Sequence, residues 1–90
     1  MRDIKVKSYS REEVNRTFGK WVRRQLYEIE RPADWLHRRL GVAGGSVNRW
    51  TNGSDLGHTL FLRTISILSK ERQISHIELL NDYWEYYFND

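Results

Sequence analysis

Apolar side chains recur at helical spacing through most of the chain, and the first such stretch follows Ser10. Its apolar positions are Val14, Phe18, Trp21, Val22, Leu26 and Ile29. Because they stand three or four residues apart, they form one stripe on the face of a helix. Ser10 and Glu13 have the spacing of a capping box, which predicts a helix start at residue 11. Gly19 lies inside the stripe and marks either a close contact between helices or a helix that starts nearer residue 17.

Two short helices are expected next, separated by a glycine turn. Pro32 ends the first stretch and suits the first turn of a helix over residues 33–40, because that turn does not use the missing N–H. Gly41 would end this second helix. A third helix is expected over residues 44–51. The core positions of the two helices would be Trp35, Leu36, Leu40, Val47 and Trp50.

The sequence pattern in the last third of the chain predicts two longer helices. One spans about residues 59–69, and Ser75 with Glu78 repeats the capping-box spacing before another that runs to about residue 87. The core candidates of the fourth helix are Leu60, Phe61, Leu62, Ile65 and Leu68. Since no segment requires a sheet, the pattern predicts a single all-α domain of five helices over residues 10–90.

Residues 1–9 are expected to form a short N-terminal arm. Ile4 and Val6 alternate with Lys5 and Lys7, a pattern typical of an extended segment or a short strand. The two lysines could enter a minor groove or follow a phosphate backbone. The alternatives are a frayed terminus and a strand that pairs with a second copy of the chain.

The composition excludes several classes of protein. Ninety residues suit one domain, and no apolar run approaches the roughly 20 residues needed to cross a bilayer. The first residues lack the apolar stretch of a secretory signal, and cysteine is absent. We therefore expect a cytoplasmic protein without disulfides and without a membrane partner.

The net charge of +3 conceals an uneven distribution. Residues 1–70 hold 14 Lys and Arg against 7 Asp and Glu, whereas residues 71–90 hold one Arg against five acids. Eleven of the 15 cations are Arg, which suits bidentate contacts to phosphate and guanine. A basic body with an acidic end favours a surface that faces a polyanion, although an ordinary solvated surface explains the charge equally well. Candidates for a basic face are Arg23, Arg24, Arg38 and Arg39.

Catalytic and metal-binding motifs are missing from the sequence. His37, His58 and His76 do not fall at a metal-ligand spacing, and no HExxH motif occurs. The glycines of residues 41–45 form neither a GxGxxG motif nor a phosphate-binding loop. We therefore expect a protein that is not an enzyme and that uses no metal and no cofactor.

The middle of the chain has the layout of two helices joined by a tight turn. Residues 36–42 end a short helix at a glycine, and residues 43–50 begin the next one almost at once. Such a turn sets two helices at about 90–120°. The start of the second helix then faces outward, where the major groove of DNA can receive it.

Through these residues, the stretch from Gly19 to about Leu80 resembles the Cro/C1-type (XRE) helix-turn-helix family of phage and bacterial repressors. The resemblance rests on Gly19-Lys20-Trp21-Val22, Leu36, Leu40-Gly41-Val42, Val47, Arg49-Trp50 and Asn52-Gly53. Leu62, Ile65, Leu68, Ile77 and Leu80 resemble the last two helices of the family. The resemblance covers about two-thirds of the chain and implies a five-helix, lambda-repressor-like fold. It also implies sequence-specific binding of double-stranded DNA, usually as a homodimer on an inverted repeat.

The resemblance assigns roles to residues around the third helix. It implies base contacts by Gly44, Gly45 and Arg49. It implies contacts to phosphates or flanking bases by Ser46, Asn48, Ala33 and the loop residues Asn52, Gly53 and Ser54. The residues that would hold the recognition helix in the core are Val47 and Trp50.

Three departures from the family bear on these roles. Gly44 and Gly45 replace polar residues that usually contact bases, which would shift recognition toward DNA shape and Arg49. His37 stands where the family prefers Ala, and we expect a core or rim histidine rather than a ligand. Asp55 places an acid on a loop that is often basic, which should weaken a phosphate contact there.

The last helix is unusually aromatic. Its residues Leu80, Tyr83, Trp84, Tyr87 and Phe88 fall on two adjacent helical faces. A monomer of this size cannot easily cover both faces, so we predict a homodimer interface here, with packing inside the monomer as the alternative. The acids of this helix would keep it away from DNA.

Together these features predict a small transcriptional repressor of phage or mobile-element type, nucleoid-associated when bound to DNA. It would occupy an inverted-repeat operator as a homodimer and be regulated by its concentration, by the arrangement of operators or by a partner protein. The alternative is a protein-interaction module on the same scaffold, such as an antirepressor or an antitoxin-like partner binder. The glycine pair and the aromatic helix favour that alternative.

Overall fold

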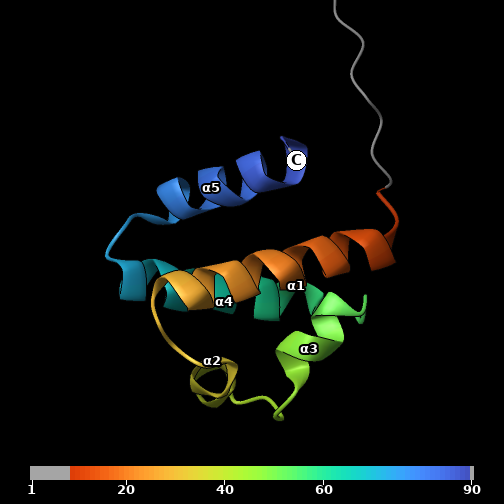
Figure 1. The fold of residues 1–90 in the computed structure, drawn as a ribbon, viewed down its shortest axis with the longest axis horizontal. Coiled ribbons are helices and arrows are strands. Elements are labelled where there is room, and N and C mark those ends of the chain that lie inside the picture. Colours follow the sequence, from red (N-terminus) through yellow and green to blue (C-terminus); the bar gives the residue numbers. More distant parts are fainter. Residues whose placement is uncertain (1–8, 90) are drawn as a thin grey trace, which may run out of the picture.

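The computed structural model describes residues 9–89, and within this range the chain forms five α-helices and no strand (Figure 1). The helices are α1 (Arg11–Glu28), α2 (Ala33–Leu40), α3 (Ser46–Thr51), α4 (Gly57–Arg72) and α5 (His76–Phe88). The predicted all-α architecture is therefore confirmed for these residues. Except for Tyr9, the predicted arm, with Lys5 and Lys7, lies outside the described residues.

The longest helix, α1, runs through the middle of the molecule and organises the others. Figure 1 shows α5 along one side of it, α3 on the other side and α4 behind it. The core joins residues from all the helices above: Phe18, Trp21, Val22, Leu26, Leu36, Leu40, Val47, Trp50, Ile65, Leu68 and Leu79. Burial of these side chains stabilises helices that would be marginal as isolated peptides.

Several predicted helix ends are confirmed by capping contacts. The Ser10 side chain accepts a hydrogen bond of 3.2 Å from the Glu13 backbone N–H, where α1 begins. Gly41 follows α2 in the left-handed conformation, with φ 71°, as a glycine helix stop requires. Ser75 and Glu78 form a complete capping box at the start of α5. These ends depend on contacts between residues close in sequence, which is why the sequence displays them.

The start of α3 differs from the prediction. The sequence pattern predicts a start at residue 44, whereas the helix begins at Ser46. Gly45 has a φ of 87°, and a residue in this left-handed conformation cannot continue a right-handed helix. Gly44 and Gly45 therefore belong to the turn, and α3 has only six residues. The fourth helix, α4, extends beyond the predicted residues 59–69 at both ends.

One predicted core position is wrong, and another is only partly buried. Leu62 is 53 % exposed, because the buried face of α4 runs through Ile65 and Leu62 lies beyond the edge of that face. Trp35 is only partly buried. Its ring contacts the guanidinium groups of Arg31 and Arg39, whose central carbons lie 5.4 and 4.5 Å from the ring centre. Trp35 therefore packs against the edge of the core, whereas Leu62 lies outside it.

The glycine within α1 marks a close contact between helices. α1 continues through Gly19 without interruption, so a helix start near residue 17 is wrong. A Cβ atom at Gly19 would lie 2.6 Å from the Thr51 backbone nitrogen and 2.8 Å from the Trp50 carbonyl carbon. The backbone of α3 thus rests directly on α1, at a distance that only glycine permits. This contact fixes where α3 sits in the molecule.

Candidate functional site

The candidate functional site consists of the two short helices α2 and α3 and the turn between them. Residues 41–45 join α2 to α3, and Gly41 and Gly45 both have positive φ, at 71° and 87°. Figure 1 shows α2 nearly end-on and α3 from the side, so the two helix axes cross steeply. Asn48 and Arg49 are exposed on the outer side of α3, whereas Val47 and Trp50 are buried in the core.

The start of α3 is held by a histidine from α2. The Val47 backbone N–H donates a hydrogen bond of 3.1 Å to Nε2 of His37, which is 5 % exposed. Burial lowers the pKa of His37 from its usual 6.5, and Arg49 lowers this pKa further, whereas Asp34 raises it. His37 is thus a core histidine that accepts a hydrogen bond in its neutral form.

Ser46 and Arg49, at opposite ends of the first turn of α3, are joined by a hydrogen bond. Ser46 is buried, and its hydroxyl donates to the Ala43 carbonyl oxygen at 2.7 Å. The same hydroxyl oxygen accepts a hydrogen bond of 2.9 Å from Nη2 of Arg49. Ser46 therefore faces the turn instead of the solvent, which places it poorly for the expected phosphate contact. Arg49 is exposed, and the backbone of Gly45 lies beside its guanidinium group.

A row of basic side chains on α1 flanks α3. Arg16, Lys20 and Arg23 share one helical face, because they are spaced four and three residues apart. Nη2 of Arg23 donates to Oδ1 of Asn48 across the helix contact at 2.6 Å. Arg16 pairs with acids of its own helix, at 3.4 and 2.9 Å.

Three of these cations have no carboxylate partner within residues 9–89, namely Lys20, Arg23 and Arg49. With Asn48 they form what we call the basic face. Lys20 was not among the residues that the sequence predicted for a basic face. The signal that could have found it is its position four residues after Arg16 and three before Arg23.

The other arginines predicted for a basic face are occupied elsewhere. Arg24 lies over the ring of Tyr86, with its central carbon 5.7 Å from the ring centre. Arg38 pairs with Asp34 at 2.9 Å, and Arg39 lies over Trp35. The structure therefore groups only Arg23 of that set with α3.

The loop after α3 is built largely from backbone hydrogen bonds. The Gly53 N–H donates to the Trp50 carbonyl oxygen at 2.9 Å, and the Ser54 N–H donates to that of Arg49 at 3.0 Å. Asn52 and Ser54 are exposed, next to the outer side of α3. Asp55 lies 4.0 Å from Arg11, so its charge is partly compensated.

Two other predicted contact residues lie at the turn and at the start of α2. Ala33 begins α2 and is partly buried, with its side chain packed against the core. Gly44 is exposed in the turn, and a Cβ atom there would meet nothing within 4 Å. Neither residue offers a polar side chain, so any contact they make is through the backbone.

The aromatic residues of α5 are divided between the core and the surface. Tyr83 packs on Phe18 and Trp21, with ring centres 5.4 and 5.0 Å apart, and Tyr87 is 6 % exposed. Burial, with Tyr87 nearby, raises the pKa of Tyr83 to about 12, so its hydroxyl is neutral. The remaining apolar residues form the outer face of α5, which is defined by Ile77, Leu80, Trp84 and Phe88.

This outer face of α5 borders an apolar groove. Trp84 is 64 % exposed and Ile77 is 72 % exposed, so the face is far from covered by the monomer. The groove has a volume of about 330 Å³ and is lined by Tyr9, Val14, Phe61, Tyr83, Trp84, Tyr87 and Phe88. Of the residues predicted for the interface, Tyr83 and Tyr87 are packed within the monomer. Leu80, Trp84 and Phe88 lie on its surface.

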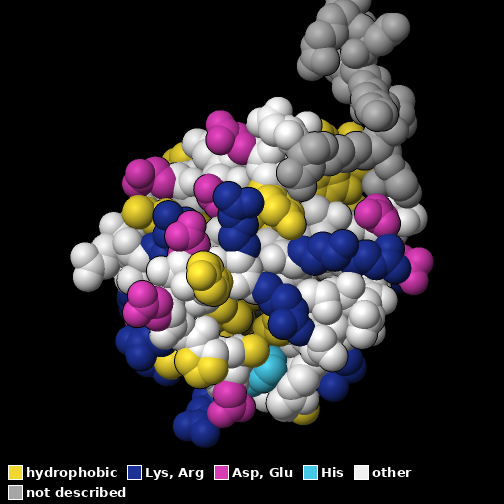
Figure 2. Space-filling view, in the orientation of Figure 1, with side chains coloured by type: hydrophobic (Ala, Val, Ile, Leu, Met, Phe, Trp, Pro, Cys, Tyr) yellow, Lys and Arg dark blue, Asp and Glu magenta, His cyan; other side chains and the backbone are white. Residues whose placement is uncertain are grey.

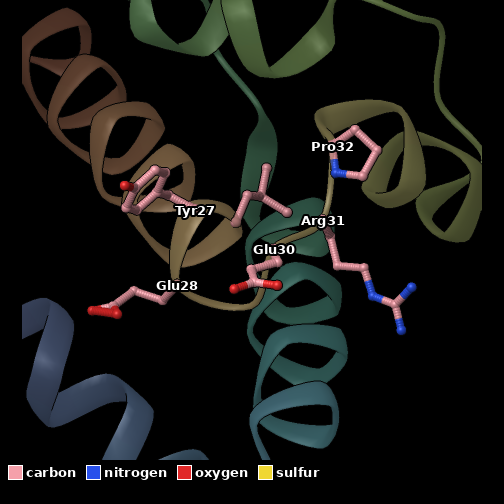
Figure 3. Close-up of a pocket in the computed structure, with 6 residues that line it drawn as sticks. Tyr27, Glu28, Glu30, Arg31 and Pro32 are labelled. Carbon is pink, nitrogen blue, oxygen red and sulfur yellow. The ribbon is translucent and has the colours of Figure 1, made fainter.

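A hollow in the surface of the described residues offers no converging chemistry. It has a volume of about 530 Å³ and lies where α1 ends, lined by Leu26, Tyr27, Glu28, Glu30, Arg31 and Pro32. Figure 3 shows that the labelled side chains point in different directions and do not converge on one position. Arg31 is paired with Glu71 at 2.8 Å. Among the described residues, no group of three His, Asp or Glu side chains could hold a metal ion.

Acidic and basic side chains are interspersed over much of the surface, and only α5 among the longer helices lacks Lys and Arg. On the face in Figure 2, Asp and Glu lie over α5, at both ends of α1 and at the lower rim, while Lys and Arg cross the middle, line the lower rim and also lie beside acids in the upper part. The helix α5 contains three acids and no Lys or Arg. Within residues 9–89, no helix is long and apolar enough to span a membrane.

Comparisons of this chain with known protein families, with curated proteins and with solved structures find no match.

Proposed function

We propose that this chain is a sequence-specific DNA-binding transcriptional regulator, a repressor of the Cro/C1 type with a lambda-repressor-like fold. The observation that best supports the proposal is the basic face, where Lys20, Arg23 and Arg49 surround the exposed side of α3 without a carboxylate partner among residues 9–89. Uncompensated cations attract the phosphate backbone, and a short helix after a tight turn fits the major groove.

Arg49 is the residue that we propose contacts a base. In the free protein its guanidinium group donates to a neutral acceptor of its own helix, the hydroxyl of Ser46. Exchanging this bond for O6 and N7 of guanine replaces one neutral acceptor by two, at little cost. A bidentate contact of this kind discriminates against other bases by about 1–3 kcal/mol. With Gly44 and Gly45 beside it, Arg49 would supply most of the direct base recognition.

The neighbouring residues are proposed to contact the phosphate backbone. Asn48 uses its Oδ1 to accept a hydrogen bond from Arg23, which turns its amide NH2 group outward as a donor for a phosphate oxygen. Lys20 and Arg23 add two positive charges on the α1 side of α3. Such contacts orient a protein on DNA without carrying sequence information.

The repressor is proposed to act as a homodimer joined through the outer face of α5. This face presents Ile77, Leu80, Trp84 and Phe88 on one side of the helix, and none of these residues carries a charge. Exposed apolar area of this kind is typical of an interface. Two copies related by a twofold axis would present two α3 helices to the two halves of an inverted repeat.

Selection of random DNA duplexes with the purified protein tests the proposal. Wild type should enrich an inverted repeat, and Arg49→Ala should lose that enrichment. Arg63→Ala is the matched control, because Arg63 is an exposed arginine of α4 outside the basic face. Binding of the enriched duplex should also weaken steeply between about 50 and 200 mM salt.

The opposite result favours the protein-interaction module. If no duplex is enriched, or if Arg49→Ala enriches the same repeat as wild type, the proposed DNA contact is wrong. The outer face of α5, with Trp84 exposed, would then be the binding surface to pursue.

A further inference from the structure

The helix α3 begins without a capping side chain of its own. Its N-cap residue is Gly45, which has no side chain to accept hydrogen bonds from the first backbone N–H groups. A capping side chain usually accepts from the second or third helical residue. The second residue is Val47, and its N–H instead donates to Nε2 of His37, ten positions earlier in the chain. A buried side chain of α2 therefore replaces the missing cap of α3.

We propose that neutral His37 is a positioning residue for α3, and that protonation of His37 releases the start of this helix and weakens DNA binding. The DNA-binding consequence rests on the function proposed above. The hydrogen bond itself can be tested without DNA, so the two ideas can fail separately.

The proton positions on the imidazole ring explain the coupling. Nε2 can accept the Val47 N–H only when it carries no proton, so the neutral ring holds its proton on Nδ1. When the ring is protonated, both nitrogens are donors, and two N–H groups would face each other across the 3.1 Å between Nε2 and the Val47 nitrogen. A positive charge at the start of a helix is also opposed by the helix dipole. Both effects drive His37 and the start of α3 apart.

The groups around His37 determine whether its stabilising effect is lost at low pH or at high pH. Burial lowers the pKa of His37 and is the largest influence; Arg49 from α3 lowers it as well, and Asp34 on α2 raises it. The helix α4 packs against α2 with uncharged buried residues, namely Thr64, Ile65, Leu68 and Ser69. Because the folded-state pKa is lowered, the stabilising effect of neutral His37 is fully present above pH 6.5 and is lost as the pH falls through the lowered pKa.

The same protonation acts on the proposed base contact. Arg49 lowers the pKa of His37, so by reciprocity a charged His37 repels the guanidinium group of Arg49. Release of the helix start and repulsion of Arg49 both disturb the surface that would meet DNA. Protonation of an exposed histidine would have the opposite sign, because added positive charge strengthens binding to a polyanion.

The hydrogen bond is tested first in the protein without DNA. In the uniformly 15N-labelled chain, we expect a scalar coupling across the hydrogen bond between the Val47 nitrogen and Nε2 of His37 at about pH 8. The coupling should vanish on acidification, with the same midpoint as the ring resonances of His37. A coupling that is absent at high pH, or that survives protonation of His37, overturns the proposal without any variant.

Two variants then connect the hydrogen bond to DNA binding, with the duplex enriched by selection as the probe. Wild type should lose affinity as the pH falls from about 8 through the lowered pKa of His37, by up to about fivefold once the ring is protonated, the effect of one capping interaction. His37→Gln keeps an acceptor oxygen near the position of Nε2 and does not titrate, so it should bind like wild type at pH 8 and lose no affinity in acid. His37→Leu keeps the apolar volume without an acceptor, so it should bind about fivefold more weakly throughout.

The controls are the two exposed histidines, His58 and His76. His58→Gln and His76→Gln should retain the loss of affinity that wild type shows in acid. Wild-type binding that stays constant or strengthens in acid overturns the proposal, as does a His37→Gln protein with the wild-type pH profile. If the coupling titrates as expected and no duplex binds, the proposed function fails while the positioning of α3 by His37 stands.

Discussion

The helices α3 and α5 lie on opposite sides of α1 and owe their positions to different kinds of contact (Figure 1). The helix α5 has 13 residues and a complete capping box, so its start is specified within its own sequence. The helix α3 has six residues and a glycine N-cap. Its position depends on Gly19 of α1, which admits its backbone, and on His37 of α2, which accepts its Val47 N–H. Residues outside α3 thus decide whether α3 is formed and where it points.

The two helices also expose different chemistry. The outer side of α3 presents Asn48 and Arg49 beside further cations of α1, whereas the outer face of α5 presents Trp84 and Ile77 on a helix with acids and no Lys or Arg. A polyanion would be attracted to the first surface and repelled from the second. The contrast teaches that a chain of this length can present two surfaces of different chemistry, because α1 separates them.

The largest expected change in the free energy of unfolding distinguishes the inner face of α5 from its outer face. Tyr83→Ala removes a ring that packs on Phe18 and Trp21 and should lower the free energy of unfolding by about 3 kcal/mol. Trp84→Ala, one residue later and 64 % exposed, should change the free energy of unfolding of the monomer by less than about 0.5 kcal/mol, measured at a dilution where the proposed dimer is dissociated. Urea unfolding measures both. Equal losses for the two variants would mean that the outer face is packed within the monomer.

Trp84→Ala also tests the proposed homodimer. Sedimentation equilibrium should show a dimer for wild type and a shift toward monomer for Trp84→Ala, because the large exposed ring is lost from the interface. A variant that dimerises as tightly as wild type would move the interface away from the outer face of α5.

A smaller effect is expected where α3 rests on α1. Gly19→Ala places a methyl group 2.6 Å from the Thr51 backbone nitrogen, and neither backbone can yield easily. We expect a loss of about 2 kcal/mol in the free energy of unfolding, despite the gain in helix propensity from alanine. Gly44→Ala is the control, because a Cβ there meets nothing within 4 Å. If Gly19→Ala stabilised the protein, the close contact of α1 with α3 would be disproved.

The smallest of these effects concerns the local cap of α5. Ser75→Ala removes the side-chain oxygen that accepts a hydrogen bond of 3.0 Å from the Glu78 N–H, and it should cost about 1 kcal/mol. Ser66→Ala, at an exposed position inside α4, should cost nothing, because alanine is the better helix former there. Thermal unfolding followed by circular dichroism compares the two. A cost below about 0.3 kcal/mol for Ser75→Ala would show that packing, not the cap, sets the start of α5.

The candidate site was only partly predictable from the sequence. Arg49 and Asn48 were expected on the outer side of the third helix and are exposed there. Ser46 was also expected to face DNA, but it lies buried against the turn, where its hydroxyl donates to the Ala43 carbonyl oxygen. The part played by Lys20 was missed, since it depends on which side of α1 meets α3.

The sequence by itself determined the number of helices within residues 10–88, their order and most of their ends. It could do so because helical periodicity, Ser75 with its capping partner, and the glycine stop at Gly41 act between residues a few positions apart. Only the tertiary structure decided that Leu62 is exposed, that Tyr83 is enclosed while Trp84 is not, and that His37 supplies the cap of α3. These outcomes depend on which helix faces meet across the core, and that choice is made by the packing of the whole chain at once.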